Sequence, residues 1–108
     1  MQRICNNIYM YHVRFVKGVE HDLKRIRADH RSLILERIQE MLTQEPRVET
    51  RNRKQLVNLV PPFEAIAPVW ELRIREYRVF YDVSEEEKIA YIRAIRRKPA
   101  HRSSGEIL

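Results

Sequence analysis

The sequence predicts a single α+β domain in which one four-stranded, antiparallel-rich sheet carries a helical hairpin on one face. Three observations lead to this prediction: an alternating segment near the N-terminus, two consecutive segments with helical spacing, and three alternating segments near the C-terminus. A chain of 108 residues is long enough for one hydrophobic core but not for two. We therefore assign residues 1–108 to one domain, with a core in residues 9–99 and a polar tail in residues 100–108.

The N-terminal half supplies one strand and both helices. Apolar and aromatic side chains alternate with other residues in residues 9–15, which predicts a strand with one buried side: Tyr9, Tyr11, Val13 and Phe15. Helical spacing of apolar residues predicts a first helix in residues 17–26 and a second that begins near Asp29 and ends before Pro46. The periodicity then fades in residues 47–68, so we expect a long exposed connection there.

The C-terminal half reads as three strands, VWELRI, YRVFYDV and KIAYIRAIRRK, joined by the turns RE and SEEE. Because side chains alternate between the faces of a sheet, counting from these turns assigns every residue to a face. One face is apolar and is expected to hold the helices: Trp70, Leu72, Ile74, Tyr77, Val79, Tyr81, Val83, Ala90, Ile92 and Ala94. The other face carries a predicted row of arginines with aromatic neighbours: Arg73, Arg78 and Arg93, with Phe80, Tyr91 and Arg97 nearby.

A row of arginines on neighbouring strands requires a counter-charge, because directly opposed like charges are destabilising. The chain has 21 Lys and Arg against 15 Asp and Glu, a net charge of +6, which fits a partner rich in phosphates or carboxylates. Guanidinium groups beside Phe80 and Tyr91 suit the phosphates and stacked bases of a nucleic acid. The alternative is a solvated face in which Glu71, Glu76 and residues 85–87 neutralise the arginines.

The composition excludes several other classes of protein. Cys5 is the only cysteine, so no disulfide can form within the chain, which suits the reducing cytoplasm. No run of 18 apolar residues and no signal-peptide pattern is present, which disfavours membrane insertion and secretion. The spacing of His12, His21 and His30 gives no compact pair of metal ligands on one helix. We therefore expect a cytoplasmic protein without a metal or cofactor.

Several motifs together resemble the RelE/ParE superfamily of bacterial type II toxins. They are the early YxVxF strand, a helical hairpin ending in EPR, the basic RKxL turn, WELRIREYRVFYDV and a closing basic strand, and they cover about residues 9–99. The most specific feature is the five-residue spacing from Arg73 to Arg78, which matches two family arginines that face each other across a hairpin. The resemblance implies a toxin that a cognate antitoxin holds silent in a hetero-oligomer.

Two activities are implied by this resemblance. RelE-like members are metal-independent endoribonucleases that cut messenger RNA in the ribosomal A site, whereas ParE-like members inhibit DNA gyrase. In the nuclease mechanism a 2′-hydroxyl group attacks the adjacent phosphate, which requires a base, cations for the developing charge and an acid for the leaving 5′-oxygen. We expect the ribosome-dependent ribonuclease, and the gyrase inhibitor is the alternative.

The resemblance also implies roles for individual residues. Arg78 matches the arginine assigned to the scissile phosphate and Arg73 matches its cross-strand companion. Lys54 lies in a segment that carries a lysine or glutamate over the cleft in relatives, so it could neutralise charge or transfer a proton; the alternative is a plain surface lysine. Many relatives have a functional tyrosine or histidine near the C-terminus; because no tyrosine follows Tyr91, His101 is the candidate acid or base.

The remaining basic and aromatic positions are expected to contact RNA: Arg53, Phe80, Tyr91, Arg93, Arg97 and Lys98. Two departures from the family pattern bear on the site. The usual glycine of the hairpin turn is Arg75, and a lysine pair of some members is replaced by Val69 and Glu71. An acidic residue on the basic face puts the usual phosphate-binding set in doubt.

Overall fold

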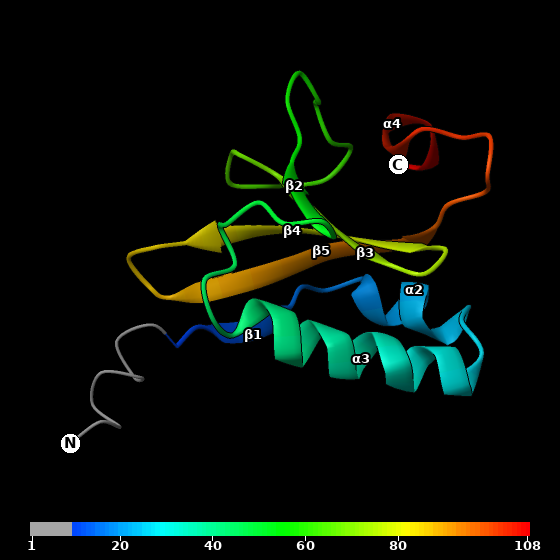
Figure 1. Cartoon of the computed structure of the whole chain (residues 1–108), viewed down its shortest axis with the longest axis horizontal. Helices are drawn as coiled ribbons and strands as arrows, with labels where there is room; N and C mark the ends of the chain where they lie inside the picture. Colours follow the sequence, from blue (N-terminus) through cyan, green and yellow to red (C-terminus); the bar gives the residue numbers. More distant parts are fainter. Residues whose placement is uncertain (1–9) are drawn as a thin grey trace.

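Five strands form one mixed sheet in the computed structural model, which describes residues 10–108. Along the chain the elements are β1 (His12–Phe15), α2 (Val19–Lys24), α3 (Ala28–Leu42), β2 (Arg53–Gln55), β3 (Trp70–Ile74), β4 (Tyr77–Ser84), β5 (Ile89–Arg97) and α4 (Ser104–Ile107) (Figure 1). The predicted α+β class is confirmed. Tyr9, the first residue of the predicted N-terminal strand, and Cys5 lie outside the described residues. None of the helices in residues 10–108 is long and apolar enough to cross a membrane.

The strand order is β1-β5-β4-β3-β2, with β1 parallel to β5 and every other pair antiparallel. The sheet therefore has one strand more than predicted. The additional strand β2 lies in the segment that we expected to be a connection, and its three residues are too few to show an alternating pattern. Its pairing with β3 places Lys54 opposite Glu71.

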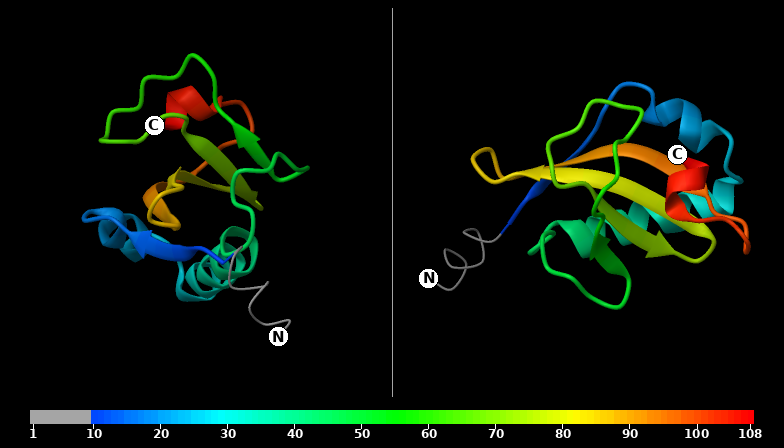
Figure 2. Two further views of the ribbon diagram at one scale, coloured as in Figure 1. Left: turned by 90° about the vertical axis from the view of Figure 1, so that its left-hand side faces the viewer. Right: turned by 90° about the horizontal axis from the view of Figure 1, so that it is seen from above.

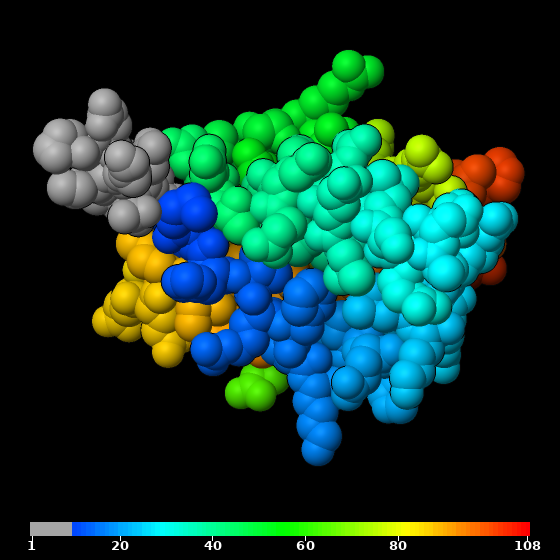
Figure 3. Space-filling view, turned by 90° about the horizontal axis from the view of Figure 1, so that it is seen from below, coloured from blue at the N-terminus to red at the C-terminus, as the bar shows by residue number. Residues whose placement is uncertain are grey.

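The helices α2 and α3 cover one side of the sheet, which we call the helix face. In α3 the buried residues Ile34, Ile38 and Leu42 recur at helical spacing and pack on apolar side chains of β3, β4 and β5: Leu72, Val79, Tyr81 and Ile92 among them. Figure 3 shows β1, α2 and α3 spread over this side of the molecule. The helix face thus holds the main hydrophobic core, as the alternation predicts.

The register of the β3–β4 hairpin is the predicted one, with Arg73 opposite Arg78 and Leu72 opposite Val79. The register predicted for β4 and β5 is wrong for two reasons. The turn occupies residues 85–88, and a bulge lies between Phe80 and Tyr81, whose partners are Ala94 and Ile92. The intervening residue, Arg93, is therefore left without its own partner, and the bulge shifts the alternation. As a result Ala94 leaves the helix face, and Arg96 takes the place opposite Arg78 that we predicted for Arg93. Arg97, which we predicted on the same face as Arg93, is instead paired with Tyr77 of the helix face.

The side of the sheet away from α3, which we call the opposite face, is partly covered and not fully open as we expected. A second apolar cluster forms there from Val69, Phe80 and Ala94 with side chains of residues 56–65 and of the C-terminus: Leu56, Phe63, Ala65, Ile107 and Leu108. Figure 2 shows α4 and the loop that precedes β3, both on the side of the sheet that faces away from α3. The C-terminal tail is thus packed against the sheet.

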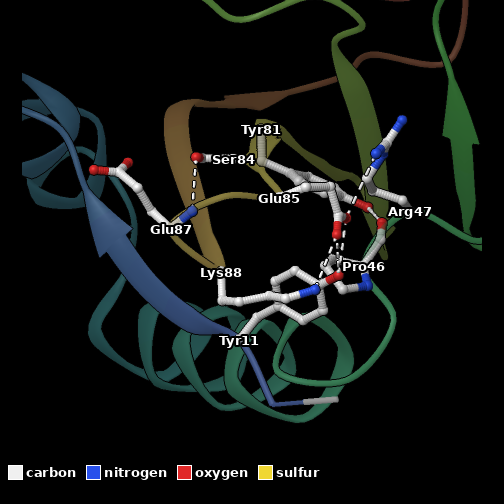
Figure 4. A network of polar contacts seen from close by, with 8 residues as sticks. All are labelled: Tyr11, Pro46, Arg47, Tyr81, Ser84, Glu85, Glu87 and Lys88. Carbon is white, nitrogen blue, oxygen red and sulfur yellow. Dashed lines mark hydrogen bonds and ion pairs between the residues drawn. The ribbon is translucent and has the colours of Figure 1, made fainter. Parts of the chain in front are cut away.

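A polar network fastens the end of the sheet next to β1 (Figure 4). The Tyr11 hydroxyl donates to both oxygens of Glu85, at 2.9 and 2.8 Å, and the carboxylate also pairs with Lys88 and Arg47. The hydrogen bond from Tyr11 is the main cause that lowers the pKa of Glu85. Nearby, the buried Tyr81 hydroxyl donates to the carbonyl of Pro46 at 2.6 Å, and burial raises its pKa.

Candidate active site

Arg73 and Arg78 lie opposite each other near the turn of the β3–β4 hairpin, on the opposite face of the sheet. Arg73 is exposed, whereas Arg78 is only 7% exposed and its Nη1 donates to the carbonyls of Arg75 and Tyr77 at 2.8 and 2.9 Å. Burial lowers the pKa of Arg78, and the charge of Arg73 lowers it further, whereas the charge of Glu71 opposes the shift. Since an arginine stays protonated in proteins, the hairpin holds two like charges together.

A small pocket of about 110 Å³ lies beside this pair, between β2 and β3. Lys54, Glu71 and Arg73 line it together with residues 50–53. The Lys54 ammonium lies 3.8 Å from one Glu71 oxygen, and the other Glu71 oxygen accepts a hydrogen bond from the Ser104 hydroxyl of α4. The pocket therefore gathers four cationic side chains around one carboxylate: Arg51, Arg53, Lys54 and Arg73 around Glu71.

Glu71 was not predicted as a functional residue, although alternation had placed it on the same face as Arg73. Its side chain is 6% exposed, against 62% for Lys54. Glu71 is buried because α4 packs beside it, and the polar sequence of the tail did not indicate that this segment packs on the sheet. The signal that could have identified it was an acidic residue at the centre of a basic face.

Arg53 and Phe80 are placed where they do not offer their side chains to RNA. Arg53 shares the helix face with its strand partner Leu72, and its Nη1 donates to the carbonyl of Met41 at 2.5 Å. That carbonyl belongs to the last turn of α3, where a cation is favourable. Phe80 is fully buried under residues 56–65 and α4, so its ring is not open to a base.

The charge of Arg93 is already neutralised within the protein. Its Nε and Nη2 donate to the two oxygens of Asp82 at 2.8 and 3.1 Å, and Asp82 is fully buried. Asp82 also accepts a hydrogen bond from the backbone of Ile66, which ties the loop before β3 to the sheet. The guanidinium of Arg93 lies 4.9 Å from the centre of the half-buried Tyr91 ring, whose hydroxyl donates to Glu87.

The last three predicted residues lie at the end of β5 and beyond it. Arg97 is exposed and pairs with Glu76 at 3.5 Å, and the backbone of Lys98 donates to the carbonyl of the same glutamate. His101 lies in the exposed turn between β5 and α4. The structure thus brings Lys54 and Arg73 together with Glu71 in one pocket, which Arg53 also lines, and sets Arg78 across the hairpin from Arg73. The other predicted residues lie outside this cluster.

A comparison with protein families finds a match over residues 13–98 to the ParE toxin of the type II toxin-antitoxin system, parDE. The chain belongs to the ParE toxin family. It is therefore a toxin of a type II toxin–antitoxin system within the RelE/ParE superfamily, as the motifs indicated. A comparison with curated protein sequences gives no match.

Solved structures similar to this ParE-family toxin include RelE proteins and their complexes. The RelBE2 toxin–antitoxin complex from Mycobacterium tuberculosis matches with a TM-score of 0.67 and 21% identity, over 82% of this chain and 99% of that chain. The archaeal RelE–RelB complex from Pyrococcus horikoshii matches with 0.63 and 25%, over 87% and 99%. The isolated Escherichia coli RelE toxin matches with 0.60 and 18%, over 87% and 88%. These similarities confirm the fold.

Proposed function

We propose that this toxin is a metal-independent endoribonuclease that cleaves messenger RNA in the ribosomal A site. The observation that carries the proposal is the pair of Arg73 and Arg78, held opposite each other by the hairpin register beside Lys54. Lys54 and Arg73 share one pocket and Arg78 lies across the hairpin from Arg73. Cations held on a rigid sheet in this way suit a phosphate that gains charge during reaction. The +6 net charge supports attraction to RNA in general.

In the proposed reaction the 2′-hydroxyl group of one nucleotide attacks the phosphate that follows it. Arg78 and Arg73 bind the non-bridging oxygens and stabilise the negative charge of the phosphorane. Lys54 is the candidate proton donor for the leaving 5′-oxygen, because it lies in the same pocket as Arg73. His101 is the second candidate, and a shift of the exposed tail would have to bring it to the phosphate.

The nucleotides next to the scissile phosphate would lie along β5 and the residues that follow it. Arg97 and Lys98 place two cations at the end of β5, where Arg97 is exposed, and the half-buried Tyr91 ring has an edge that a base can contact. Arg93, Arg53 and Phe80 act in this proposal by fixing the loop, β2 and the second apolar cluster, because their side chains are engaged inside the protein.

A gyrase inhibitor is the second candidate function. Two observations favour it: the family model that matches is that of ParE toxins, and no tyrosine follows Tyr91 to act as a late acid or base. In that case the same arginine pair would contact a protein or DNA surface without chemistry.

The partner of the toxin is expected to be an antitoxin encoded beside it, since the similar structures include toxin–antitoxin complexes. An acidic, amphipathic segment would complement a +6 surface. The toxin would act in the cytoplasm, where messenger RNA and ribosomes are found. Expression should arrest bacterial growth unless that antitoxin is present.

Primer extension on messenger RNA from expressing cells, beside a gyrase supercoiling assay, separates the two candidates. New cuts within translated codons, absent with the Arg73→Ala, Arg78→Ala double variant, are the expected result. Loss of supercoiling and double-strand DNA breaks without RNA cuts would replace the nuclease proposal by the gyrase inhibitor. Unimpaired growth with neither effect would contradict both.

A further inference from the structure

We propose that Glu71 is the general base, which takes the proton from the attacking 2′-hydroxyl group. The inference rests on the proposed RNA cleavage and assigns the proton acceptor, a role that none of the cations can fill. A metal-independent attack needs a proton acceptor within hydrogen-bond distance of the attacking hydroxyl. Arginines and a lysine ammonium have no free lone pair for this purpose.

The position of Glu71 is unusual for a residue that merely balances charge. Its carboxylate is almost completely buried on the opposite face, whereas its partner Lys54 is mostly exposed. Burying a carboxylate costs free energy because the group loses its contacts with water, and charged partners beside it must offset that cost. It also repels the phosphate that the neighbouring Arg73 and Arg78 attract. Such an arrangement weakens binding of RNA in the ground state, so a role in the reaction itself explains it better than a role in binding.

The contact with Ser104 shows that the carboxylate can accept a hydrogen bond from an alcohol. The Ser104 hydroxyl donates to the Glu71 oxygen that does not face Lys54. A ribose 2′-hydroxyl group is also an alcohol and can make the same hydrogen bond. Ser104 therefore occupies the place that we assign to the attacking hydroxyl, and substrate must displace it.

The segment that carries Ser104 is small enough to be displaced. Helix α4 has four residues, capped by the Ser103 hydroxyl and Glu106, and packs on the sheet through Ile107 and Leu108. Exchanging the Ser104 hydroxyl for the ribose hydroxyl leaves the number of hydrogen bonds to Glu71 unchanged. The exchange therefore requires that the last turn of the chain move away from Glu71, at the expense of the contacts of Ile107 and Leu108 with the second apolar cluster.

The proton balance of the step can be written in full. The 2′-hydroxyl proton passes to Glu71 while the 2′-oxygen forms a bond to phosphorus. The bond between phosphorus and the 5′-oxygen breaks, and the 5′-oxygen takes a proton from the Lys54 ammonium. The products are a 2′,3′-cyclic phosphate and a 5′-hydroxyl end. Glu71 then returns its proton to water, and Lys54 regains one from water, which restores both groups.

The test is single-turnover cleavage on programmed ribosomes by the wild type, Glu71→Gln and Ser104→Ala. Glutamine keeps the size of the side chain and can accept the Ser104 hydrogen bond, but it is far too weak a base. We expect Glu71→Gln to cleave about 10²-fold or more slowly. Its association with the ribosome should be unchanged or tighter, because a negative charge beside the phosphate site is lost. Ser104→Ala should cleave at least as fast as the wild type.

Three outcomes would overturn the inference. The first is cleavage at the wild-type rate by Glu71→Gln. The second is an equal loss of cleavage in Glu71→Gln and Ser104→Ala, which would mean that Glu71 only anchors α4. The third is a loss of ribosome association in Glu71→Gln that parallels its loss of cleavage. An inactive wild type would instead contradict the proposed function. Thermal unfolding controls for folding, and Glu71→Asp, which keeps the carboxylate, should recover part of the cleavage that Glu71→Gln loses.

Discussion

The two faces of the sheet use the same alternating strands in different ways. On the helix face, apolar side chains pack on α3, and burial of apolar area supplies the stability. On the opposite face, Glu71, Asp82 and Arg78 are buried together with a smaller apolar cluster, and ion pairs and backbone carbonyls satisfy them. Buried ions contribute little net stability when paired and are strongly destabilising when one partner is lost. Three of the four buried charged residues in the described part of the chain thus lie on the opposite face, Glu71, Arg78 and Asp82, and on this face we propose that the chemistry takes place.

The largest expected effect on stability is on the opposite face, at the buried ion pair of Arg93 and Asp82. Arg93→Ala leaves a fully buried carboxylate without its partner, so we expect a loss of about 3–5 kcal/mol in the free energy of unfolding. Urea denaturation measures it. Arg97→Ala is the control, because its exposed pair with Glu76 is worth about 1 kcal/mol or less. Similar small losses in both variants would mean that the Asp82 pair is not a structural element.

The next effect is expected on the helix face. Ile38→Ala removes a fully buried side chain of α3 and leaves a cavity, with an expected loss of about 2–5 kcal/mol. Leu35→Ala, on the partly exposed side of the same helix, should lose much less. The same urea experiment compares the two. If Leu35→Ala lost as much as Ile38→Ala, the division between the two sides of α3 would be wrong.

The smallest effect concerns the polar network at the end of the sheet. Because the folded state lowers the pKa of Glu85, its contribution to stability is present above the pKa of the unfolded chain and is lost as pH falls through the folded value. Glu85→Gln should therefore reduce the loss of stability between about pH 6 and pH 3, by less than about 1 kcal/mol for so exposed a group. The exposed neighbour Glu86 serves as the control, and an equal effect of Glu86→Gln would contradict the network.

The sequence predicted correctly those pairings of strands that follow from a short turn and from the alternation of side chains between the two faces. The RE turn sets the β3–β4 register, and with it the pairing of Arg73 and Arg78. The bulge at Arg93 was not predictable, because an extra residue in a strand leaves no mark in an apolar pattern that continues on both sides. The turn was also displaced by one residue, since Lys88 adopts a left-handed backbone conformation that lysine rarely favours.

The candidate site was predictable to a similar extent. Alternation placed Arg73, Arg78 and Glu71 on one face, but only tertiary structure shows that Lys54 joins them through β2 and that α4 buries Glu71. Arg53 and Phe80 were wrongly expected at the surface because their neighbours in space, the end of α3 and the C-terminal residues, are far away in the sequence.

The most direct test of the central claim, that the paired arginines of the opposite face stabilise the transition state of RNA cleavage, is single-turnover cleavage by Arg78→Ala on programmed ribosomes. Removing a comparable donor lowers the rate by about 10²–10³. We predict that loss for the bound complex, with ribosome association weakened only a few-fold, whereas Arg97→Ala should weaken association and its salt dependence and leave the bound rate unchanged. A wild-type cleavage rate for Arg78→Ala once bound to the ribosome would contradict the claim.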